Sequence, residues 1–410
     1  MKNQVLYISY DGMTDQLGQS QVLPYIIELT KKGFHFTLIS CEKKEKFEKN
    51  KELILKICNE NKIDWQPLYY HKWPPVFSTI WDVYAIKQLA SKLHRKKNFS
   101  LLHCRGYISS LVGLNFKLKF GIKFLFDMRG LWADEKVDAG AWELKNPLYK
   151  KVYSFFKKKE KEFLVHSDHI ISLTQKGKEE LISWNVHESV KNKITVIPCC
   201  VDTNLFNPEI VSPSHKLKWM NKLSIDENHQ VICYLGSIGT WYMLDEMLDF
   251  YMVWRENKSK PKFLFITHEE HDKIIFKAKE KNIADEIILQ PATRNEIPTL
   301  LSLAQLSVFF IRPTYSKISS SPTKLAEIMA MGIPIICNSG VGDTDKIISQ
   351  FNAGCLVKEF NSNSYKQIIY NFNTIKFEAT EIREKSQLNF DVNVATDIYS
   401  KIYNKLINQD

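Results

Sequence analysis

The chain has 410 residues, of which 44% are hydrophobic and 25% charged, and it carries a formal net charge of +10. This length and composition indicate a globular protein with two or three domains. The eight cysteines form no CxxC pair, the N-terminus lacks a basic segment followed by an apolar one, and no apolar run reaches membrane-spanning length. We therefore expect reduced thiols in a cytoplasmic protein, and neither secretion nor a transmembrane helix.

The positive charge is concentrated in the first half of the chain. Residues 1–195 contain 33 Lys and Arg against 21 Asp and Glu, a difference of +12, whereas residues 196–410 contain 23 against 25, a difference of −2. Residues 92–99 and 145–164 mix lysines with aromatic residues. Such faces bind anionic lipid or nucleic acid, or are only solvated. No nucleic-acid-binding motif is present to favour nucleic acid.

Apolar strands and helices alternate from the first residues. The expected strands of the first half are QVLYIS, FHFTLIS, IDWQPLYY, SLLHCR, IKFLFDM, HIISLT and KITVIP. The helices expected between them cover residues 19–32, 45–61, 80–96, 108–120 and 147–167. Strands separated by helices of this length predict right-handed βαβ units and a parallel sheet.

The same alternation starts again in the second half of the chain. Its expected strands are HQVICYLG, KFLFITH, EIILQP, LSVFFIRP, IPIICN and AGCLVK. The segment PCCVDTNLFNPEIVSPS between the halves is rich in Pro, Asn and Asp, as domain boundaries are. The sequence therefore predicts an α/β protein of two doubly wound Rossmann-like domains, residues 1–200 and 201–385. Residues 386–410 are expected to contain an amphipathic helix that packs back across the domain boundary.

Two loops of the first half follow strands directly, at the edge where open parallel sheets bind ligands. The loop YDGMTDQLGQS contains Gly18, which lets the backbone approach a ligand, although glycines used only for turns explain the loop equally well. The segment FDMRGLWADEKVDAGAW begins with Asp127 and Arg129 at the end of a strand. Carboxylates and aromatic rings at this density suit a sugar, and solvated surface charges are the alternative.

The first loop of the second half, GSIGT, is rich in small residues. It places Gly236, Ser237, Gly239 and Thr240 between a strand and a helix. Small residues and free amides at a helix N-terminus form a site for phosphate. The motif is short, so its weight comes from its place at the start of the second sheet.

The segment IRPTYSKISSSPTKLAEIMAMG contains a lysine at an unusual position. Ser321 suits an N-cap and Pro322 the first helical position, which puts Lys324 third, at the positive end of the helix dipole. A bound anion would reverse that repulsion. Glu327 lies one turn on, where it either pairs with Lys324 or accepts hydrogen bonds from vicinal hydroxyls of a ligand. These groups, with Arg312 as a second cation, predict a site for a nucleoside diphosphate.

Two further patterns are assigned no chemistry. Asp343 and Asp345 precede an apolar helical run, where helix caps are commoner than metal ligands, so no metal site is predicted. His103 ends a strand and is expected to be a structural histidine with satisfied nitrogens. No G-x-S-x-G elbow of a serine hydrolase occurs in the sequence.

Together these motifs resemble those of family 4 of the glycosyltransferases, which are retaining enzymes with the GT-B fold. The resemblance rests on the N-terminal glycine loop, on VIPCCVDTNLFNP and on SPTKLAEIMAMGIPII, and it spans nearly the whole chain. It implies that the C-terminal domain holds a UDP- or GDP-linked sugar and that the N-terminal domain holds a saccharide or lipid-linked acceptor. The reaction is then expected in the cleft between the domains.

The resemblance also implies roles for single residues. Glu327 matches the second Glu of the family's E-x7-E motif, which binds the ribose, and Ser319 stands where the first Glu contacts the donor sugar. The Arg and Lys that the family places after the first glycine of the second domain are absent here, which leaves Arg312 and Lys324 as the nearest cations. The catalytic candidates are Asp127, Arg129 and Lys324, and the remaining donor-binding candidates are Gly18, Gly236, Ser237, Gly239, Thr240, Thr293, Ser321, Pro322, Thr323 and Leu325.

The function implied by the resemblance is hexosyl transfer in the synthesis of cell-surface polysaccharide or lipopolysaccharide. The resemblance also implies independence from metal ions, which is the norm in the family, and no resident cofactor is expected. The basic first half favours peripheral binding at the inner face of the cytoplasmic membrane, and nucleic acid is not an expected partner. Two alternatives stay open: a catalytically silent GT-B binding or scaffold protein, and a GT-B epimerase acting on a free nucleotide sugar.

Overall fold

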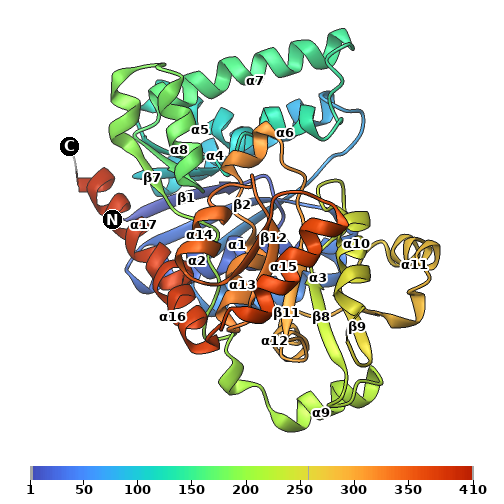
Figure 1. Ribbon diagram of the computed structural model, residues 1–410. Helices are drawn as coiled ribbons and strands as arrows, with labels where there is room; N and C mark the ends of the chain where they lie inside the picture. The colour runs from blue at the N-terminus through green and yellow to red at the C-terminus, as the bar shows by residue number, and fades with distance from the viewer. Residues whose placement is uncertain (1–2, 257, 409–410) are drawn as a thin grey trace. The chain divides into compact units, whose positions relative to one another are not determined.

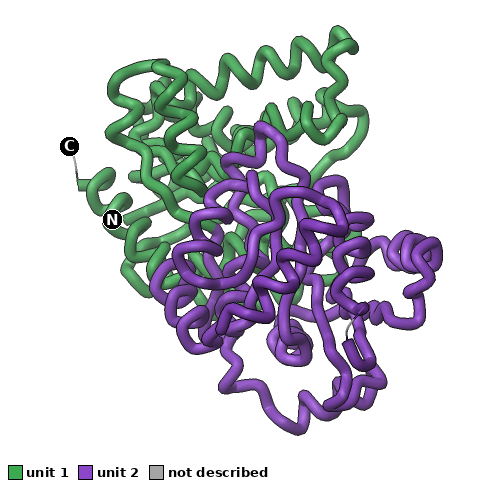
Figure 2. The backbone as a smooth tube through the Cα atoms, in the orientation of Figure 1, with its two compact units in different colours: residues 1–198, 392–410 green, residues 199–391 purple. Residues whose placement is uncertain are grey.

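The computed structural model describes residues 3–256 and 258–408 of the chain. Two compact units divide it: unit 1 holds Met1–Pro198 with Val392–Asp410, and unit 2 holds Cys199–Asp391 (Figure 2). Each unit is a parallel β-sheet covered by helices (Figure 1). The predicted fold class, two Rossmann-like α/β domains, is therefore confirmed.

The second crossing between the units lies later in the chain than predicted. The sequence predicts residues 386–391 in the final segment, but they belong to unit 2. Helix α16, Ala379–Phe390, lies against helix α13, Thr323–Ala330, and the hydroxyl of Ser386 donates to the carbonyl of Ala326 at 3.2 Å. This packing holds residues 386–390 in unit 2, and the last helix starts only at Val392.

The sheet of unit 1 has seven parallel strands in the order β3-β2-β1-β4-β5-β6-β7. The strands are β1 (Gln4–Ser9), β2 (His35–Glu42), β3 (Asp64–Tyr69), β4 (Leu101–Arg105), β5 (Lys123–Asp127), β6 (His169–Ser172) and β7 (Ile194–Val196). The direction of progression reverses between β1 and β4, so the loops at their carboxyl ends diverge there. That topological switch point is where open α/β sheets bind ligands.

The helices of unit 1 follow the predicted alternation with one difference. They are α1 (Gln16–Gln21), α2 (Leu23–Lys31), α3 (Lys44–Glu60), α4 (Phe77–Lys97), α5 (Gly106–Phe120), α6 (Trp132–Asp138), α7 (Pro147–His166) and α8 (Gln175–Ser183). The single helix predicted over residues 19–32 is two helices, because the chain leaves helical geometry at Val22 and Pro24 lacks the N–H that would continue α1. Helices α4, α5 and α7 lie together on one side of the sheet (Figure 1).

The last helix, α17 (Val392–Asn408), belongs to the core of unit 1. The hydroxyl of Tyr403 lies 2.5 Å from Nδ1 of His103 on β4, and its ring packs against Phe34 with centroids 5.1 Å apart. Lys32, at the end of α2, pairs with Asp397 at 2.6 Å. The C-terminal segment therefore fills space next to β4 and α2. No helix in the described part of the chain is long and apolar enough to span a membrane.

His169 on β6 is expected to make the stability of unit 1 depend on pH. Burial, together with the charges of Lys405 and Lys193, lowers its pKa from 6.5 to about 4. Between these values the unfolded state binds more protons than the folded state, so the free energy of unfolding falls as the pH drops, by up to about 3 kcal/mol. A His169→Gln variant, which can keep the 2.9 Å contact with Oγ1 of Thr195, should show a flatter profile in urea titrations from pH 6.5 to 4. The same slope in both proteins would contradict this expectation.

The sheet of unit 2 has six parallel strands in the order β10-β9-β8-β11-β12-β13. The strands are β8 (Gln230–Leu235), β9 (Pro261–Ile266), β10 (Ile287–Gln290), β11 (Leu306–Phe309), β12 (Ile335–Asn338) and β13 (Gly354–Val357). The other helices are α9 (Pro213–Lys222), α10 (Leu244–Arg255), α11 (His271–Glu280), α12 (Ile297–Leu301), α14 (Thr344–Gln350) and α15 (Ser362–Thr374). Here the switch point lies between β8 and β11.

Candidate functional site

The loops that follow β8 and β11 are joined at the carboxyl edge of the unit 2 sheet. The N–H of Arg312 donates to the carbonyl of Trp241 at 2.9 Å, and Tyr242 forms an isolated antiparallel bridge with Ile311. The two loops leave strands on either side of the switch point, where a ligand is expected. The start of α13 reaches the same place, because the position of a Cβ on Gly236 would lie 3.1 Å from Nζ of Lys324.

Lys324 is a buried cation in the first turn of α13. Its residue is 6% exposed, its ammonium donates to Oη of Tyr234 at 2.8 Å, and the ring centres of Tyr234 and Tyr242 lie 4.0 and 3.7 Å from Nζ. Burial lowers the pKa of Lys324 well below its usual range, because the charged form loses its hydration. The aromatic faces offset only part of that loss. An anion bound here would supply the missing counter-charge.

Helix α13 begins one residue later than predicted. Its N-cap is Pro322 and its first residue is Thr323, so Lys324 is the second helical residue and not the third. Ser321, the predicted N-cap, instead accepts a hydrogen bond at Oγ from the N–H of Cys199 at 3.1 Å. Ser321 does not cap the helix because its hydroxyl is used to bind the backbone of Cys199, the first residue of unit 2. Lys324 still lies at the positive end of the helix dipole.

Leu325 is a packing residue. It is buried, and its N–H donates to the carbonyl of Pro322 at 3.0 Å, inside the first turn of the helix. The N–H of Leu325 is therefore already used within the helix and does not support the predicted contribution of Leu325 to donor binding. The predicted end of the helix is confirmed, since Gly332 follows the last turn with a φ of +69°.

Glu327 lies one turn after Lys324, and its carboxylate pairs with Arg294 at 2.9 Å. Burial raises the pKa of Glu327, and the charge of Arg294 acts against this rise. Arg294 comes from the loop after β10, where its guanidinium lies 5.1 Å from the ring centre of Phe206. Nη2 of Arg294 is buried and has no hydrogen-bond partner among the described residues. The pair therefore offers a ligand both an acceptor and a donor.

The glycine loop after β8 is not the start of a helix, contrary to prediction. Residues 236–240 are followed by the bridge at Tyr242, and α10 begins only at Leu244. Gly236 has a φ of +111°, which side chains rarely adopt, so glycine is required where the backbone passes over Lys324. The carbonyl of Ser237 accepts a hydrogen bond from Oη of Tyr234 at 2.5 Å, and the Cβ position of Gly239 is open.

Two further cations lie at Trp241. Arg312, the predicted second cation, is exposed and donates from Nη2 to the carbonyl of Thr240 at 2.8 Å. Lys317 is buried, with Nζ 3.7 Å from the ring centre of Trp241. The sequence motifs do not single out Lys317, because its distance from Trp241 depends on the turn over Tyr315–Ser319 and not on any local spacing.

Two hydroxyl residues among the donor-binding candidates make local hydrogen bonds. The hydroxyl of Ser319 donates to the carbonyl of Ser316 at 3.0 Å. The N–H and Oγ1 of Thr293 both donate to Glu296, at 2.8 and 2.7 Å, just before α12. These are the bonds of turns and helix starts. The effect of Thr293 on the site is indirect, because its turn fixes the loop that carries Arg294.

Asp343 and Asp345 also make local contacts. Asp343 occupies the N-cap position of α14, and the carboxylate of Asp345 accepts the N–H of Gly340 at 3.2 Å. Within the part of the chain that the structure describes, no three His, Cys, Asp or Glu side chains are grouped so as to hold a metal ion.

The first loop of unit 1 is organised by Glu42, a residue that the sequence motifs also leave unmarked. Its buried carboxylate accepts the N–H groups of Met13 and Thr14 at 2.7 and 3.0 Å. A Cβ on Gly12 would lie 2.7 Å from Oε2 of Glu42, and a Cβ on Gly18 would lie 2.2 Å from the carbonyl oxygen of Gly12. The backbone of its own loop therefore requires glycine at position 18, which is the alternative that the sequence left open, and a part for Gly18 in donor binding stays a prediction.

Asp127, at the carboxyl end of β5, is the centre of a buried group of charges. Nε2 of His103 lies 3.3 Å and Nη1 of Arg105 lies 3.8 Å from its Oδ2, while Nη1 of Arg129 lies 3.7 Å from its Oδ1. Burial acts to raise the pKa of Asp127, but these neighbours, with Arg129 first, more than offset it and the pKa is lowered. Oδ1 is buried without a hydrogen-bond partner among the described residues. An ionised carboxylate whose Oδ1 makes no hydrogen bond and faces Arg129 suits a sugar hydroxyl.

Arg129 reaches Asp127 from a backbone conformation that is rare outside glycine. Its φ is +58°, which costs about 1 kcal/mol or more, and strain of this kind collects at functional sites. Nη2 of Arg129 also lies 3.5 Å from Oε1 of Gln21. The structure therefore brings Asp127 and Arg129 together as predicted. It adds Arg105 and His103, which the motifs had not connected with them.

Two family models match consecutive regions of the sequence. The model of Glycosyltransferase Family 4 matches residues 21–205, and the model of Glycosyl transferases group 1 matches residues 215–387. Each match covers most of one compact unit. No match was found among curated protein sequences.

Solved structures with this fold cover the whole chain at low sequence identity. Sucrose-phosphate synthase from Thermosynechococcus elongatus has a TM-score of 0.74 at 16% identity and covers 100% of both chains. Anabaena Alr3699/HepE in complex with UDP and glucose has a TM-score of 0.71 at 11% identity, over 97% of this chain and 98% of that one. The lipopolysaccharide outer core galactosyltransferase WaaB, in its apo form, has a TM-score of 0.63 at 13% identity, over 98% and 99%. At such identities the likeness shows the fold.

Proposed function

Because the chain belongs to the glycosyltransferases of the family 4 type with the GT-B fold, we propose that it transfers a hexose from a nucleotide-diphosphate donor with retention of configuration. The acceptor in this proposal is a saccharide or a lipid-linked saccharide of cell-surface polysaccharide or lipopolysaccharide synthesis. The observation that carries the proposal is the environment of Lys324. This cation is buried under Gly236 between the rings of Tyr234 and Tyr242, and no carboxylate of the described residues forms an ion pair with it.

Unit 2 is the donor side in this proposal. The diphosphate lies against the first turn of α13, where the helix dipole and Lys324 both favour negative charge. The ribose hydroxyls donate to the carboxylate of Glu327, which Arg294 keeps in place at 2.9 Å. Uridine is the first base to test, because Anabaena Alr3699/HepE shares the fold and was solved in complex with UDP and glucose.

The chemistry follows from the charge that develops on the leaving group. The bond between the anomeric carbon and the phosphate oxygen breaks, its electron pair stays on that oxygen, and the sugar acquires oxocarbenium character. The acceptor oxygen then forms its bond from the face that the diphosphate leaves, and its proton passes to a diphosphate oxygen. A prepositioned cation such as Lys324 lowers this barrier without reorganising. No protein base is required, and transfer should persist in EDTA.

Unit 1 is the acceptor side in this proposal. Asp127 and Arg129 offer an acceptor and a donor at the carboxyl edge of the sheet, and Arg105 pairs with Asp11 at 3.3 Å beside them. Buried or half-buried charges of both signs bind the hydroxyls of a sugar through charge-assisted hydrogen bonds. Donors that carry a nucleotide are made in the cytoplasm, so the cytoplasm is the proposed location.

A Glu327→Ala variant tests the donor side directly. The loss of a charged acceptor for two hydroxyls costs about 1.5–3 kcal/mol, so the KM for the nucleotide sugar should rise about tenfold to a hundredfold. A Glu381→Ala variant, which removes an exposed carboxylate from α16, is the control and should leave the KM unchanged. Thermal-shift screening of UDP- and GDP-sugars, followed by NMR of the product anomer, identifies the donor and the stereochemistry.

The alternatives predict different products. A silent binding protein would show a thermal shift with nucleotide sugar, about 2.7 kcal/mol at a hundred times the dissociation constant, but no transfer or hydrolysis. An epimerase would change the free nucleotide sugar without any acceptor. Formation of an inverted product, or transfer that Glu327→Ala leaves intact, would contradict the proposed reaction.

A further inference from the structure

Unit 1 carries a row of large apolar side chains that face solvent. We call it the α4 face; it consists of Trp73, Phe77, Ile80, Trp81 and Tyr84. Their exposed fractions are 80%, 68%, 60%, 59% and 54%. Positions 77, 80, 81 and 84 share one side of helix α4, because the α-helix repeats every 3.6 residues. Single exposed apolar residues are ordinary, but a contiguous group of this size marks an interaction surface.

Hydrogen bonds hold α4 in this orientation. Asp82, on the opposite side of the helix, is buried and accepts from Oη of Tyr10 at 2.8 Å, and Nδ1 of His71 lies 2.6 Å from its other oxygen. Ser78 is buried on the same side. The helix therefore directs small and polar groups inward and aromatic groups outward. Rotation of α4 to bury its aromatic residues would leave the carboxylate of Asp82 without these partners.

Positive charge continues along the α4 face. Residues 65–126 contain ten Lys and Arg and one acidic residue, Asp82, which is the buried one. Lys92, Arg95 and Lys96 are exposed further along α4 and extend its solvent side. Leu118 and Phe120, 64% and 45% exposed, end the neighbouring helix α5 beside these cations. Aromatic and aliphatic groups thus adjoin cations, and this stretch places no exposed carboxylate among them.

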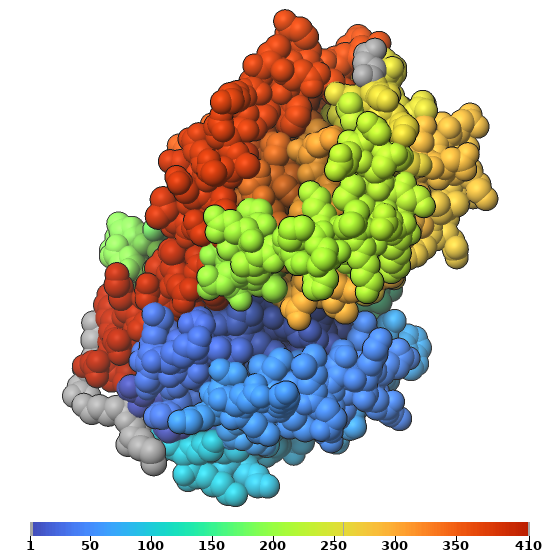
Figure 3. Space-filling model, turned by 90° about the horizontal axis from the view of Figure 1, so that it is seen from below, coloured from blue at the N-terminus to red at the C-terminus, as the bar shows by residue number. Residues whose placement is uncertain are grey.

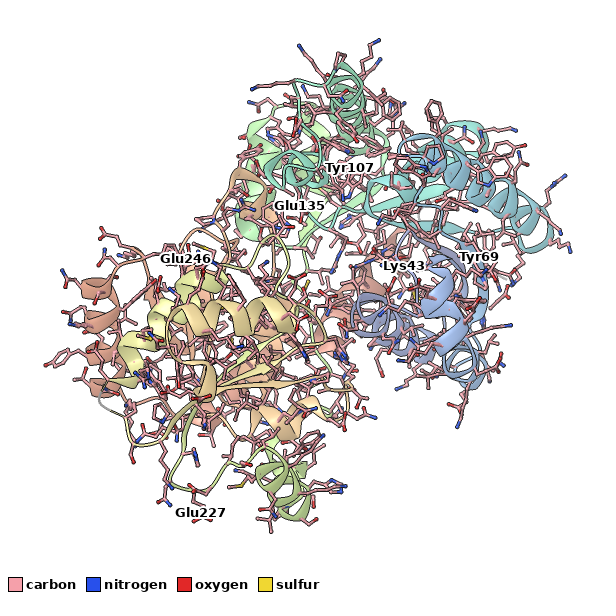
Figure 4. All side chains as sticks on the ribbon, turned by 90° about the vertical axis from the view of Figure 1, so that its right-hand side faces the viewer. Lys43, Tyr69, Tyr107, Glu135, Glu227 and Glu246 are labelled. Atoms are coloured by element: carbon pink, nitrogen blue, oxygen red, sulfur yellow. The ribbon has the colours of Figure 1, made fainter. Side chains whose placement is uncertain are left out.

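The α4 face starts at the functional edge of the unit 1 sheet. The loop before α4 follows the carboxyl end of β3, and Tyr69 on that strand pairs in register with Glu42, next to Lys43 (Figure 4). The ring of Tyr70 packs on Tyr10, with centroids 5.5 Å apart, in the loop after β1. The segments drawn in blue in Figure 3 form a continuous surface of unit 1. The α4 face is therefore anchored at the edge that also carries Asp127.

We propose that the α4 face binds the surface of an anionic lipid bilayer. Aromatic rings of this kind lie at the level of the lipid headgroups, and Lys and Arg beside them contact phosphates. The proposed function adds a purpose, since a lipid-linked acceptor in that bilayer would meet the edge with Asp127. Binding itself rests only on the α4 face, so it can be tested without sugar transfer.

Vesicle binding is the direct test. The full-length protein is mixed with vesicles of phosphatidylcholine alone or with 30% phosphatidylglycerol, roughly the anionic content that makes a surface negative enough to attract cations. Sedimentation gives the bound fraction, and bromolipid quenching reports insertion of tryptophan. We expect binding to the anionic vesicles, weakening with salt, and quenching that disappears in part when Trp73 and Trp81 are replaced.

Two sets of variants assign the binding to the α4 face. Phe77→Ser with Trp81→Ser should lower vesicle affinity about tenfold for each ring, and Lys92→Gln, Arg95→Gln and Lys96→Gln about fivefold for each charge. The aromatic control is Phe276→Ser with Tyr370→Ser, at 60% and 66% exposed positions of unit 2.

The charge control removes three cations from α7: Lys150→Gln, Lys151→Gln and Lys158→Gln. Both control proteins should bind nearly as the parent does. Melting curves of all variants should coincide, because every changed side chain faces solvent.

Several outcomes would overturn the proposal. These are no binding to anionic vesicles at low salt, a control that weakens binding as much as its α4 counterpart, or a concentration-dependent dimer that the Phe77→Ser, Trp81→Ser protein no longer forms. The donor site is followed separately: a Lys324→Met protein should bind vesicles normally, and the α4 variants should keep their thermal shift with nucleotide sugar. Failure of membrane binding and failure of the proposed reaction are thus seen in different measurements.

Discussion

A Lys324→Met variant is expected to lower kcat/KM for sugar transfer by two to three orders of magnitude, roughly the loss measured when one prepositioned charge-stabilising donor is removed. Methionine fills a similar volume between Tyr234 and Tyr242 without a charge. The free energy of unfolding should rise at the same time at neutral pH, because the variant no longer buries an ammonium whose pKa is lowered by desolvation. One substitution thus moves activity and stability in opposite directions.

The stability difference between the Lys324→Met variant and the parent protein should depend on pH. The folded protein releases the proton of Lys324 at a lower pH than the unfolded chain does, so the unfolded state binds more protons and the free energy of unfolding rises with pH. The stability gained by Lys324→Met should therefore be largest at neutral pH and vanish toward about pH 10.4, the ordinary pKa of lysine. Urea titrations of both proteins at several pH values measure it.

Donor binding provides a second test of the protonation of Lys324. A diphosphate favours the charged form of Lys324, so at pH values where the free protein has released this proton, donor binding should take a proton up. Calorimetry over a pH series, in buffers of different ionisation enthalpy, detects that uptake. The variant should show none. Lys366→Met, which alters an exposed lysine of α15, is the control for both experiments. A destabilised Lys324→Met protein, or one that keeps its activity, would contradict the assignment.

An Asp127→Asn variant should lose about 3 kcal/mol of stability and about a hundredfold in kcat/KM. The first effect arises because Arg105 and Arg129 lose the buried carboxylate that faces both of them, and Arg105 keeps only its contact with the half-exposed Asp11. The second arises because a sugar would no longer be held in its reactive position. The pKa of Asp127 is lowered in the folded state, so its stabilisation is present at neutral pH and is lost as the pH falls through that lowered pKa. The variant should therefore have a flatter acid profile.

Asp168→Asn is the matched control for Asp127. Asp168 pairs with Lys117 at 2.7 Å and accepts the N–H of Phe124 at 2.8 Å, at the opposite end of β5. Its replacement should reduce stability without changing kcat/KM. Donor affinity, measured by thermal shift, should stay normal in both variants, because both residues lie in unit 1. Equal losses of activity in the two proteins would make Asp127 a structural residue only.

The sequence predicts those parts of the site that are close together in the chain. The helical repeat connects Lys324 with Glu327, and one short loop connects Asp127 with Arg129. The ion pair between Glu327 and Arg294 spans 33 residues, so no periodicity reveals it. The contact of Glu42 with the Thr14 hydroxyl is equally invisible to local sequence patterns, because 28 residues separate the two.

The fold is more predictable than the site for a related reason. Strands such as QVICYL and IIC are buried on both faces, and their continuous apolar runs are visible without a partner. The errors lie where hydrogen bonds compete at element ends. Ser321 binds Cys199 and does not cap α13, and the bridge at Tyr242 delays α10 to Leu244. Both outcomes depend on tertiary contacts that local sequence rules do not contain.

The chain enters unit 2 and leaves it at neighbouring points, so unit 2 is an insertion within unit 1. Val201 bridges to Asp391, and the N–H of Val201 donates to the carbonyl of Phe390 at 2.8 Å. Residues 199–391 can therefore be exchanged as one continuous block whose ends meet, whereas residues 1–198 lack α17 and the Tyr403 contact to His103. Chimaeras made to alter donor choice should be cut at both crossings, because a chimaera cut only at the first would place a foreign final helix where Tyr403 contacts His103 and Asp397 pairs with Lys32.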